Sequence, residues 1–170
     1  MMKYCWECGN KLILKECFNC SESEGLVPYC EKCDTFRFPI FNTAVSMVVF
    51  NKDFSKSLLI QQYNRGVYGL VAGYVEKGEN LSQTLIRELK EETNLNAISF
   101  KFNESKYFDK TNTLMCNFMV QAESEDIKTN SEIDEAHWFD ISTACKNVYP
   151  NSLAGYFLDL AVEKISKIQP

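Results

Sequence analysis

The chain has 170 residues and a net charge of −5, with 45% hydrophobic residues, which suits one ordinary domain and a small additional unit. The acidic balance argues against a general nucleic-acid-binding surface, because such surfaces are basic. The apolar stretch at 44–50 is far shorter than a membrane span, and the segment from Met1 to Cys5 has no apolar signal region. We therefore expect a cytoplasmic protein that binds neither a membrane nor a long nucleic acid.

The N-terminal segment is rich in cysteine. Six of the eight cysteines lie in the first 33 residues, in three Cys-x-x-Cys pairs: Cys5/Cys8, Cys17/Cys20 and Cys30/Cys33. A secreted disulfide framework would need an export signal, whereas thiols in a reducing compartment point to Zn²⁺, which takes four ligands in structural sites. The sequence therefore predicts a structural zinc site.

Two of the pairs have the form of zinc knuckles. Cys5 to Gly9 ends in a glycine that suits the tight turn, and Cys30 to Cys33 is the natural second knuckle. Between them, residues 11–15 and 25–29 are predicted to be the two strands of a ribbon. We expect the zinc ligands to be Cys5, Cys8, Cys30 and Cys33. The alternative is a set that uses Cys17 or Cys20, which fall at the far end of this hairpin. The later Cys116 and Cys145 are predicted to be small buried hydrophobes.

The rest of the chain has a mixed α/β pattern. Apolar segments bounded by turn signals predict strands at 44–50, 58–63 and 68–75, and then, after a helix, near 97–108, 114–122 and 135–141. A last amphipathic helix is predicted from Ser152, a good N-cap, to Ile168. This order of elements favours an α/β fold.

The helix in the middle of the chain has clear start and stop signals. Asn80 followed by Gln83 is typical of an N-cap with its capping-box partner. Asn94 lies just beyond the periodic segment, where a left-handed residue often ends a helix. Leucines recur every fourth residue between these caps and predict a buried stripe: Leu81, Leu85 and Leu89.

Three carboxylates crowd one edge of this predicted helix, beside the apolar stripe: Glu88, Glu91 and Glu92. A run of charge on a helix is ordinarily a solvated face, and like charges so close destabilise an isolated helix. A bound divalent cation explains the cluster better, since hard cations such as Mg²⁺ take oxygen ligands. We therefore expect a metal site on this edge.

The spacing of the segment 73–95 carries a family resemblance. Gly73 is followed by Glu79, then by Arg87-Glu88-Leu89, by Glu91-Glu92, and by Asn94-Leu95. This resembles the signature of the Nudix hydrolases, with one departure: Asn94 stands where the family usually has glycine. Asparagine is the commonest substitute at such a position, because it tolerates positive φ. The resemblance implies an α/β/α sandwich with a mixed sheet and hydrolysis of nucleoside diphosphate derivatives with divalent metal.

The ribbon sharpens this resemblance. A four-cysteine ribbon directly before a Nudix domain resembles the NADH pyrophosphatase subfamily, as does the aromatic-basic-aromatic-proline exit Phe36-Arg37-Phe38-Pro39. The resemblance covers nearly the whole chain and predicts a zinc ribbon at 1–38 and a Nudix domain at 39–170. It also suggests a homodimer.

The resemblance also implies roles for single residues. The catalytic, metal-binding glutamates would be Glu88, Glu91, Glu92 and Glu132, which bind Mg²⁺ or Mn²⁺ together with the Ala72 carbonyl oxygen. Glu135 is the alternative to Glu132. Supporting roles are expected for Gly73, Glu79 and Arg87, of which Arg87 can hold a carboxylate bidentately. His137, the single histidine, is expected to be structural.

The choice of substrate is less constrained. NADH pyrophosphatases have a Ser-Gln-Pro-Trp-Pro-Phe-Pro-x-Ser segment where this chain has residues 105–113, with neither proline nor tryptophan. We expect a flexible, polar segment there and a relaxed choice of the second moiety. The candidate substrate contacts are Phe38, Phe108, Thr113 and Ala154.

These observations together predict a pyrophosphohydrolase that acts on an NAD(H)-like dinucleotide. One alternative is hydrolysis of ADP-ribose or another nucleoside diphosphate derivative. An alternative of another class is a non-catalytic module that senses nucleotides or serves as a zinc-ribbon adaptor.

Overall fold

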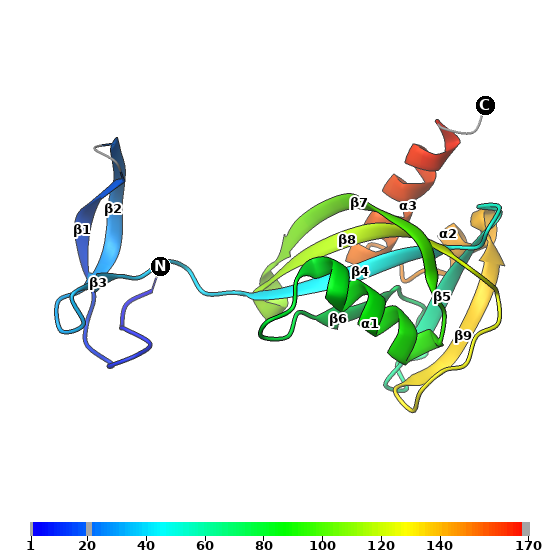
Figure 1. Cartoon of the computed structure of the whole chain (residues 1–170), viewed down its shortest axis with the longest axis horizontal. Coiled ribbons are helices and arrows are strands. Elements are labelled where there is room, and N and C mark those ends of the chain that lie inside the picture. The colour runs from blue at the N-terminus through cyan, green and yellow to red at the C-terminus, as the bar shows by residue number, and fades with distance from the viewer. Residues whose placement is uncertain (1, 20–21, 168–170) are drawn as a thin grey trace. The chain divides into compact units, whose positions relative to one another are not determined.

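The computed structural model describes residues 2–19 and 22–167. The chain divides into two compact units, residues 1–41 and 42–170, which are drawn in Figure 1. No helix in the part of the chain that the structure describes is long and apolar enough to cross a membrane.

The N-terminal unit is a three-stranded antiparallel sheet in the order β1-β2-β3. Its strands are β1 (Ile13–Asn19), β2 (Glu22–Cys30) and β3 (Thr35–Phe36). The predicted ribbon hairpin is present but longer than expected, because the pairing continues past Cys17, which lies opposite Gly25. Cys17 is thus part of a strand, whereas Cys20 lies outside the described residues.

The second unit is built on a mixed sheet of six strands in the order β7-β8-β4-β5-β9, with β6 paired to β4. The strands are β4 (Asn42–Phe50), β5 (Lys56–Gln62), β6 (Val71–Tyr74), β7 (Ala97–Phe108), β8 (Thr113–Ala122) and β9 (Ile133–Asp140). The central strands β4 and β8 are parallel and the other pairs are antiparallel. The other edge of β4 is shared, since β6 pairs with its first half and β5 with its last two residues.

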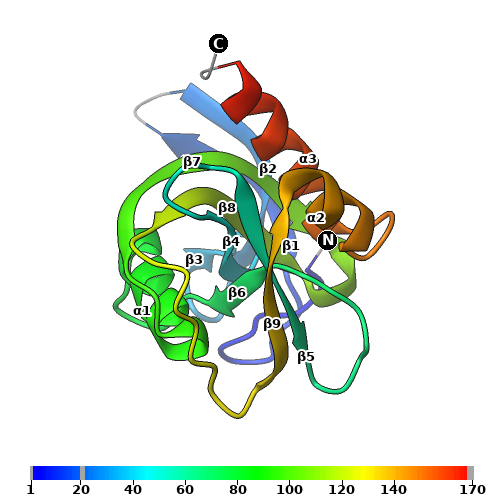
Figure 2. The same ribbon diagram turned by 90° about the vertical axis from the view of Figure 1, so that its right-hand side faces the viewer.

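Helices cover both faces of this sheet. They are α1 (Leu81–Thr93), α2 (Ile141–Asn147) and α3 (Leu153–Ser166). Figure 2 shows α1 on one side and α2 and α3 on the other. The α2 helix was not predicted, because seven residues are too few for a helical period to be recognised. Ser152 caps α3 as predicted, accepting a hydrogen bond from the Gly155 amide at 3.0 Å, while the predicted end at Ile168 lies outside the described residues.

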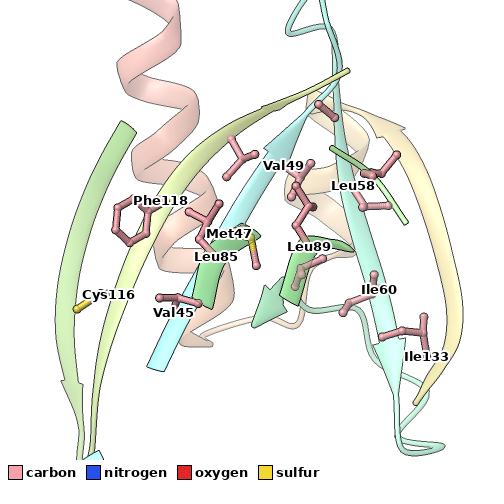
Figure 3. Packing of buried hydrophobic residues seen from close by; sticks show 14 residues of the cluster. Val45, Met47, Val49, Leu58, Ile60, Leu85, Leu89, Cys116, Phe118 and Ile133 are labelled. Atoms are coloured by element: carbon pink, nitrogen blue, oxygen red, sulfur yellow. The ribbon is translucent and has the colours of Figure 1, made fainter. Parts of the chain in front are cut away.

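Alternation along the central strands creates two apolar cores. On β4, Val45, Met47 and Val49 belong to the cluster that contains Leu85 and Leu89 of α1 (Figure 3). Val48 and Phe50, which point to the opposite face of β4, belong to a second cluster together with residues of α2 and α3. Side chains of a strand alternate between faces, so one strand supplies both cores. The predicted α/β/α sandwich is confirmed.

The helix α1 begins and ends as the sequence predicts. The Asn80 side chain accepts a hydrogen bond from the Gln83 amide at 3.0 Å, and the Gln83 side chain accepts one from the Asn80 amide at 2.9 Å. At the other end Asn94 is left-handed, with φ 58° and ψ 11°. Because both ends are fixed by local signals, the glutamates of α1 keep a defined position against the sheet.

Candidate functional site

Two of the α1 glutamates are turned towards the sheet and a third faces solvent. Glu92 is buried, at 4% exposed, and the Glu88 side chain is 13% exposed. Glu91, on the outer edge of the same helix, has a side chain that is 56% exposed. The predicted carboxylate cluster is therefore partly inside the protein, which distinguishes it from a solvated charged face.

Glu88 fits against the sheet only because residue 73 is glycine. A Cβ atom at Gly73 would lie 1.9 Å from the Glu88 Cδ atom, so any side chain there would displace the carboxylate. Gly73 lies on β6 between Ala72 and Tyr74. The backbone of Ala72 approaches Glu92, since it lowers the pKa of that carboxyl group. Strand β6 therefore meets both buried glutamates.

Glu92 has an unsatisfied carboxylate oxygen. Its Oε1 accepts a hydrogen bond from Gln62 Nε2 at 2.7 Å, whereas its buried Oε2 has no partner among the residues that the structure describes. Burial, followed by the charge of Glu88, raises the pKa of Glu92 to about 8. A lone buried oxygen next to a second carboxylate suits a divalent cation, which would supply the missing partner and offset the repulsion.

Arg87 organises the outer side of the cluster. Its Nε and Nη2 groups donate to the two carboxylate oxygens of Glu79 at 2.7 and 2.9 Å. Its Nη1 group donates to Glu88 at 2.7 Å and to Glu91 at 3.2 Å. Hydrogen bonds from Arg87 and Thr84 lower the pKa of Glu79 to about 2. The structure thus brings together the expected pair of Arg87 and Glu79, and the same guanidinium orients the helix glutamates.

Glu132 and Glu135, the two candidates for a further ligand, have different surroundings. Glu132 immediately precedes β9, and its charge contributes to raising the pKa of both Glu88 and Glu92, so it lies within electrostatic reach of them. Glu135 accepts a hydrogen bond from the Tyr68 hydroxyl at 3.0 Å. This geometry favours Glu132 as the fourth carboxylate of the site.

The expected substrate contacts are spread over several places. Phe108 lines a pocket of about 680 Å³, and Ala154 lines a pocket of about 170 Å³. The two pockets share Tyr149 and Ser152. Phe38 is exposed in the N-terminal unit. Thr113 is only 1% exposed and its hydroxyl is hydrogen-bonded to that of Thr111 at 2.9 Å, so its position does not favour a substrate contact.

The segment expected to be flexible is a regular turn. A 3₁₀ turn, η1 (Asp109–Thr111), joins β7 to β8. The Tyr107 hydroxyl donates to the Asn112 side chain across this turn at 2.6 Å, and the Asn42 amide donates to the Asn112 carbonyl at 2.8 Å. Hydrogen bonds therefore hold this segment in place, although it contains no proline.

Gln62 is a further candidate site residue, which the sequence motifs did not indicate. It donates to Glu92 and also lines the 170 Å³ pocket. The signal was present in the strand pattern, because Leu58 and Ile60 face α1 and residue 62 continues the same alternation. A polar residue at the end of a buried row is a candidate partner for a buried group on the facing helix.

The N-terminal unit contains a second candidate metal site. The ligand atoms of Cys5, Cys8, Cys30 and Cys33 all lie within 4.8 Å of one another. The sulfur atoms of Cys8 and Cys30 are 3.5 Å apart. Cys17 is not part of this group. Within residues 2–19 and 22–167, no other set of three or more Cys, His, Asp or Glu side chains brings its ligand atoms so close together. Four thiols converging at one point suit tetrahedral zinc.

Arg37 is a further residue whose place the sequence did not indicate. Its side chain is buried, and its Nε donates to the Cys5 sulfur at 3.2 Å. Burial opposes ionisation of Cys5, but hydrogen bonds from the backbone of Cys8 and Glu7 and from Arg37 lower its pKa to about 6. The basic residue of the ribbon's exit thus stabilises a thiolate, the form of cysteine that binds metal.

Comparison with known proteins agrees with this geometry. The family model described as NUDIX domain matches residues 41–156. The curated relatives include the NAD-capped RNA hydrolase NudC of Vibrio atlanticus, 28% identical over 170 aligned residues that cover 98% of this chain and 60% of the relative. The protein of that name from Pseudomonas fluorescens is 27% identical over 154 residues, covering 87% of this chain and 56% of its own. The chain therefore spans somewhat more than half the length of these relatives.

Solved structures show the same fold. A NUDIX hydrolase from Nitrosomonas europaea matches with a TM-score of 0.65 and 23% identity, covering 99% of this chain and 95% of that chain. The NUDIX domain of Shewanella oneidensis NrtR, solved with ADP ribose, matches with a TM-score of 0.64 and 18% identity, covering 81% of this chain and 94% of its own. Because the family model matches more than half of the sequence and the fold agrees, the chain belongs to the NUDIX domain family.

Proposed function

We propose that the chain hydrolyses the diphosphate bond of a nucleoside diphosphate derivative, with an NAD(H)-like dinucleotide as the first candidate. One observation carries the proposal: the buried Oε2 atom of Glu92, which the charge of Glu88 influences, has no hydrogen-bond partner among the described residues. Such an arrangement is unfavourable for a fold alone, because each buried polar atom without a partner destabilises the native state. It is well suited to a site that holds a divalent cation and an anionic substrate.

The residues divide into those that bind metal and those that handle protons. Glu88, Glu92 and Glu132, with Glu91 and the Ala72 carbonyl, would hold Mg²⁺ or Mn²⁺. When bound, such a metal neutralises phosphate oxygens and makes a coordinated water more acidic. Glu92 is buried and already accepts a hydrogen bond from Gln62, so it has little contact with solvent. Glu91 and Glu132 are exposed, so one of these two would accept the proton of the attacking water.

The substrate class follows from the pockets and the relatives. The 170 Å³ pocket shares Gln62 with the glutamate cluster, and the 680 Å³ pocket beyond it has aromatic walls that include Phe108 and Tyr156. Aromatic rings stack on nucleobases. The relatives' names specify NAD-capped RNA, while the solved NrtR domain was crystallised with ADP ribose. Nucleotides linked through a diphosphate are common to both.

A competing proposal is a sensing module without catalysis. The favouring observation is the similarity to the NUDIX domain of NrtR with ADP ribose, which at 18% identity concerns the fold alone. Against it, every motif glutamate is retained, from Glu79 to Glu92. A module that only binds a nucleotide would not need an unpartnered buried carboxylate oxygen.

A product assay tests the proposal. The purified protein would be incubated with NADH, NAD⁺, ADP-ribose and an NAD-capped RNA oligonucleotide, with Mg²⁺ or Mn²⁺ and with EDTA as the control. We expect two mononucleotides from NADH only when metal is present. We also expect kcat/KM for NADH to exceed that for NAD⁺ or ADP-ribose by less than about a hundredfold, near 2.7 kcal/mol. Binding of ADP-ribose without turnover of any compound would support the sensing module instead.

We further propose that the ribbon binds one structural Zn²⁺ through Cys5, Cys8, Cys30 and Cys33. The convergence of their sulfur atoms supports this, as does the hydrogen bond that Arg37 donates to Cys5. Metal-bound thiolates commonly accept hydrogen bonds from neighbouring donors. This zinc would be separate from the metal used in catalysis.

A further inference from the structure

The turn that follows β5 carries a cation next to the glutamate cluster. Tyr63, Asn64 and Gly66 all have positive φ, at 58°, 53° and 62°, so the chain reverses sharply between Gln62 and Val67. The Asn64 amide donates to the Asp134 carboxylate at 2.6 Å, which fastens the turn to β9 two residues after Glu132. Arg65 therefore projects from a turn that is tied to the strand beside the site.

Two hydrogen bonds place this turn near the carboxylates, since Gln62 just before it donates to Glu92 and Asn64 within it donates to Asp134. Burial, followed by the charges of Glu132 and Glu92, raises the pKa of Tyr63. The guanidinium carbon of Arg65 lies 5.5 Å from the centre of the Tyr63 ring, within the range of a cation–π contact. The Tyr63 ring thus packs against the guanidinium of Arg65, which lines the same pocket as Gln62.

Arg65 is the arginine without an acidic partner. The chain has three arginines. Arg37 is paired with Glu7 and Arg87 with the motif glutamates, whereas Arg65 has no ion pair among the residues that the structure describes.

Nearby carboxylates are used by other donors. Asp134 accepts from the Asn64 amide and Glu135 from the Tyr68 hydroxyl. Neither bond involves Arg65, whose guanidinium forms no ion pair among the described residues and can therefore donate to an anion.

The pocket beside Arg65 shows where such an anion would lie. Arg65 lines the 170 Å³ pocket together with Gln62, Tyr68 and Ala154. Gln62 also donates to Glu92, so the same side chain contacts both the pocket and the glutamate cluster. Pockets that hold a whole drug-sized ligand measure about 300–1,000 Å³, so this one is sized for a fragment. A phosphoryl group with part of its sugar fits that description.

We propose that Arg65 binds the phosphoryl group of the diphosphate that water does not attack, and thereby selects substrates with two linked phosphoryl groups. The inference rests on the proposed function, because it assumes that the attacked phosphorus lies at the glutamates. Arginine suits this role, since its planar fork donates two parallel hydrogen bonds to phosphate oxygens. Metal held by the glutamates would neutralise the attacked group, and Arg65 would neutralise its neighbour.

The test compares a ligand that has two phosphoryl groups with one that has a single group. The probes are the methylene analogue of ADP, in which a CH₂ group replaces the bridging oxygen and prevents cleavage, and AMP. Their affinities would be measured by calorimetry with Mg²⁺ for the parent protein, Arg65→Ala, Arg65→Lys and Lys52→Ala. Lys52 lies in the turn before β5 and lines none of the pockets described above, so its variant is a matched loss of one surface cation.

We expect Arg65→Ala to weaken the analogue about 10- to 100-fold, while its affinity for AMP changes less than about twofold. Arg65→Lys should fall between the parent and Arg65→Ala, because lysine retains the charge but not the fork. Lys52→Ala should bind both probes like the parent. Equal weakening of both probes by Arg65→Ala, or no weakening of either, would overturn the proposal.

This binding test is independent of turnover. If the parent protein cleaves no diphosphate compound yet binding of the analogue depends on Arg65, the proposed hydrolysis fails, while the selection of two linked phosphoryl groups by Arg65 stands. If NADH is cleaved while Arg65→Ala binds the analogue like the parent, the assignment of Arg65 fails alone.

Discussion

The two candidate metal sites differ in what surrounds them. In the N-terminal unit the described buried side chains are few and include the thiols themselves: Cys5, Cys17, Tyr29, Cys30 and Arg37. In the second unit two apolar clusters fill both faces of the sheet, and the carboxylates of α1 lie at the edge of one of them. In the first unit a bound metal would take the place of a core, whereas in the second a complete apolar core holds the proposed metal ligands in position.

The difference follows from size. Below about 40 residues a chain rarely buries enough apolar surface to fold without disulfides, metal or a partner. The ribbon is of this size, and we expect its metal to supply folding free energy. The larger unit can support the opposite arrangement, in which like charges are held together at the expense of stability. We therefore expect metal removal to unfold one unit and to leave the other folded but inactive.

The largest expected effect is on the ribbon. Cys5→Ser and Cys33→Ser should each abolish the one zinc expected per chain, since structural zinc sites contribute about 10–16 kcal/mol at neutral pH. The ribbon should then become sensitive to protease while the second unit stays resistant. Elemental analysis and limited proteolysis measure both effects. Cys17→Ser is the matched control and should retain zinc; loss of zinc from this variant alone would refute the ligand set.

The next effect is on turnover. Glu91→Gln and Glu92→Gln should each lower kcat by at least about a hundredfold, near 2.7 kcal/mol, because metal-bound carboxylates act in the transition state. The circular dichroism spectrum should not change, since the core does not depend on these charges. Glu123→Gln, an exposed carboxylate at the end of β8, is the control. Parent-like turnover in both motif variants would show that this edge of α1 is not the metal site.

A smaller effect separates the two candidates for the fourth carboxylate. Glu132→Gln should lower kcat/KM about tenfold, near 1.4 kcal/mol, because the charge of Glu132 acts on both Glu88 and Glu92. Glu135→Gln should change it less than about twofold, since the amide oxygen can still accept from Tyr68. Steady-state kinetics at saturating Mg²⁺ decide between them, and the reverse order of effects would transfer the role to Glu135.

The smallest effect concerns the end of α1. Asn94 is left-handed, so Asn94→Gly should change the free energy of unfolding by less than about 0.5 kcal/mol, while Asn94→Ala should lower it by about 1 kcal/mol. Denaturant titration of the second unit measures this difference. Equal stability of the two variants would mean that the left-handed cap does not fix the end of the helix.

Local signals in the sequence were sufficient for much of the fold. The caps of α1 depend on residues three positions apart and its buried stripe on residues four apart, so both could be predicted from the sequence. The thiol group could be predicted because two knuckles provide four ligands. The α2 helix could not, since seven residues carry too little periodicity.

Contacts between distant residues were the harder part. Gln62 is hydrogen-bonded to Glu92, 30 positions away in the sequence, and Arg37 to Cys5, 32 positions away. The local sequence pattern around either residue does not indicate its partner. Thr113 is the reverse case: its hydroxyl suggested a ligand contact in the sequence, whereas in the structure the residue is buried and its hydroxyl is hydrogen-bonded to Thr111. Tertiary packing decides which polar side chains face a ligand.

The closeness of the four thiols has a consequence for handling the protein. With metal bound, every sulfur would be occupied as a ligand and protected from oxidants. Without it, the sulfurs of Cys8 and Cys30 are left 3.5 Å apart and those of Cys5 and Cys33 4.0 Å apart. Oxygen or peroxide can then join such neighbours as disulfides. A chelator used without a reducing agent would thus turn a reversible loss of zinc into a lasting one, which fresh zinc alone would not reverse.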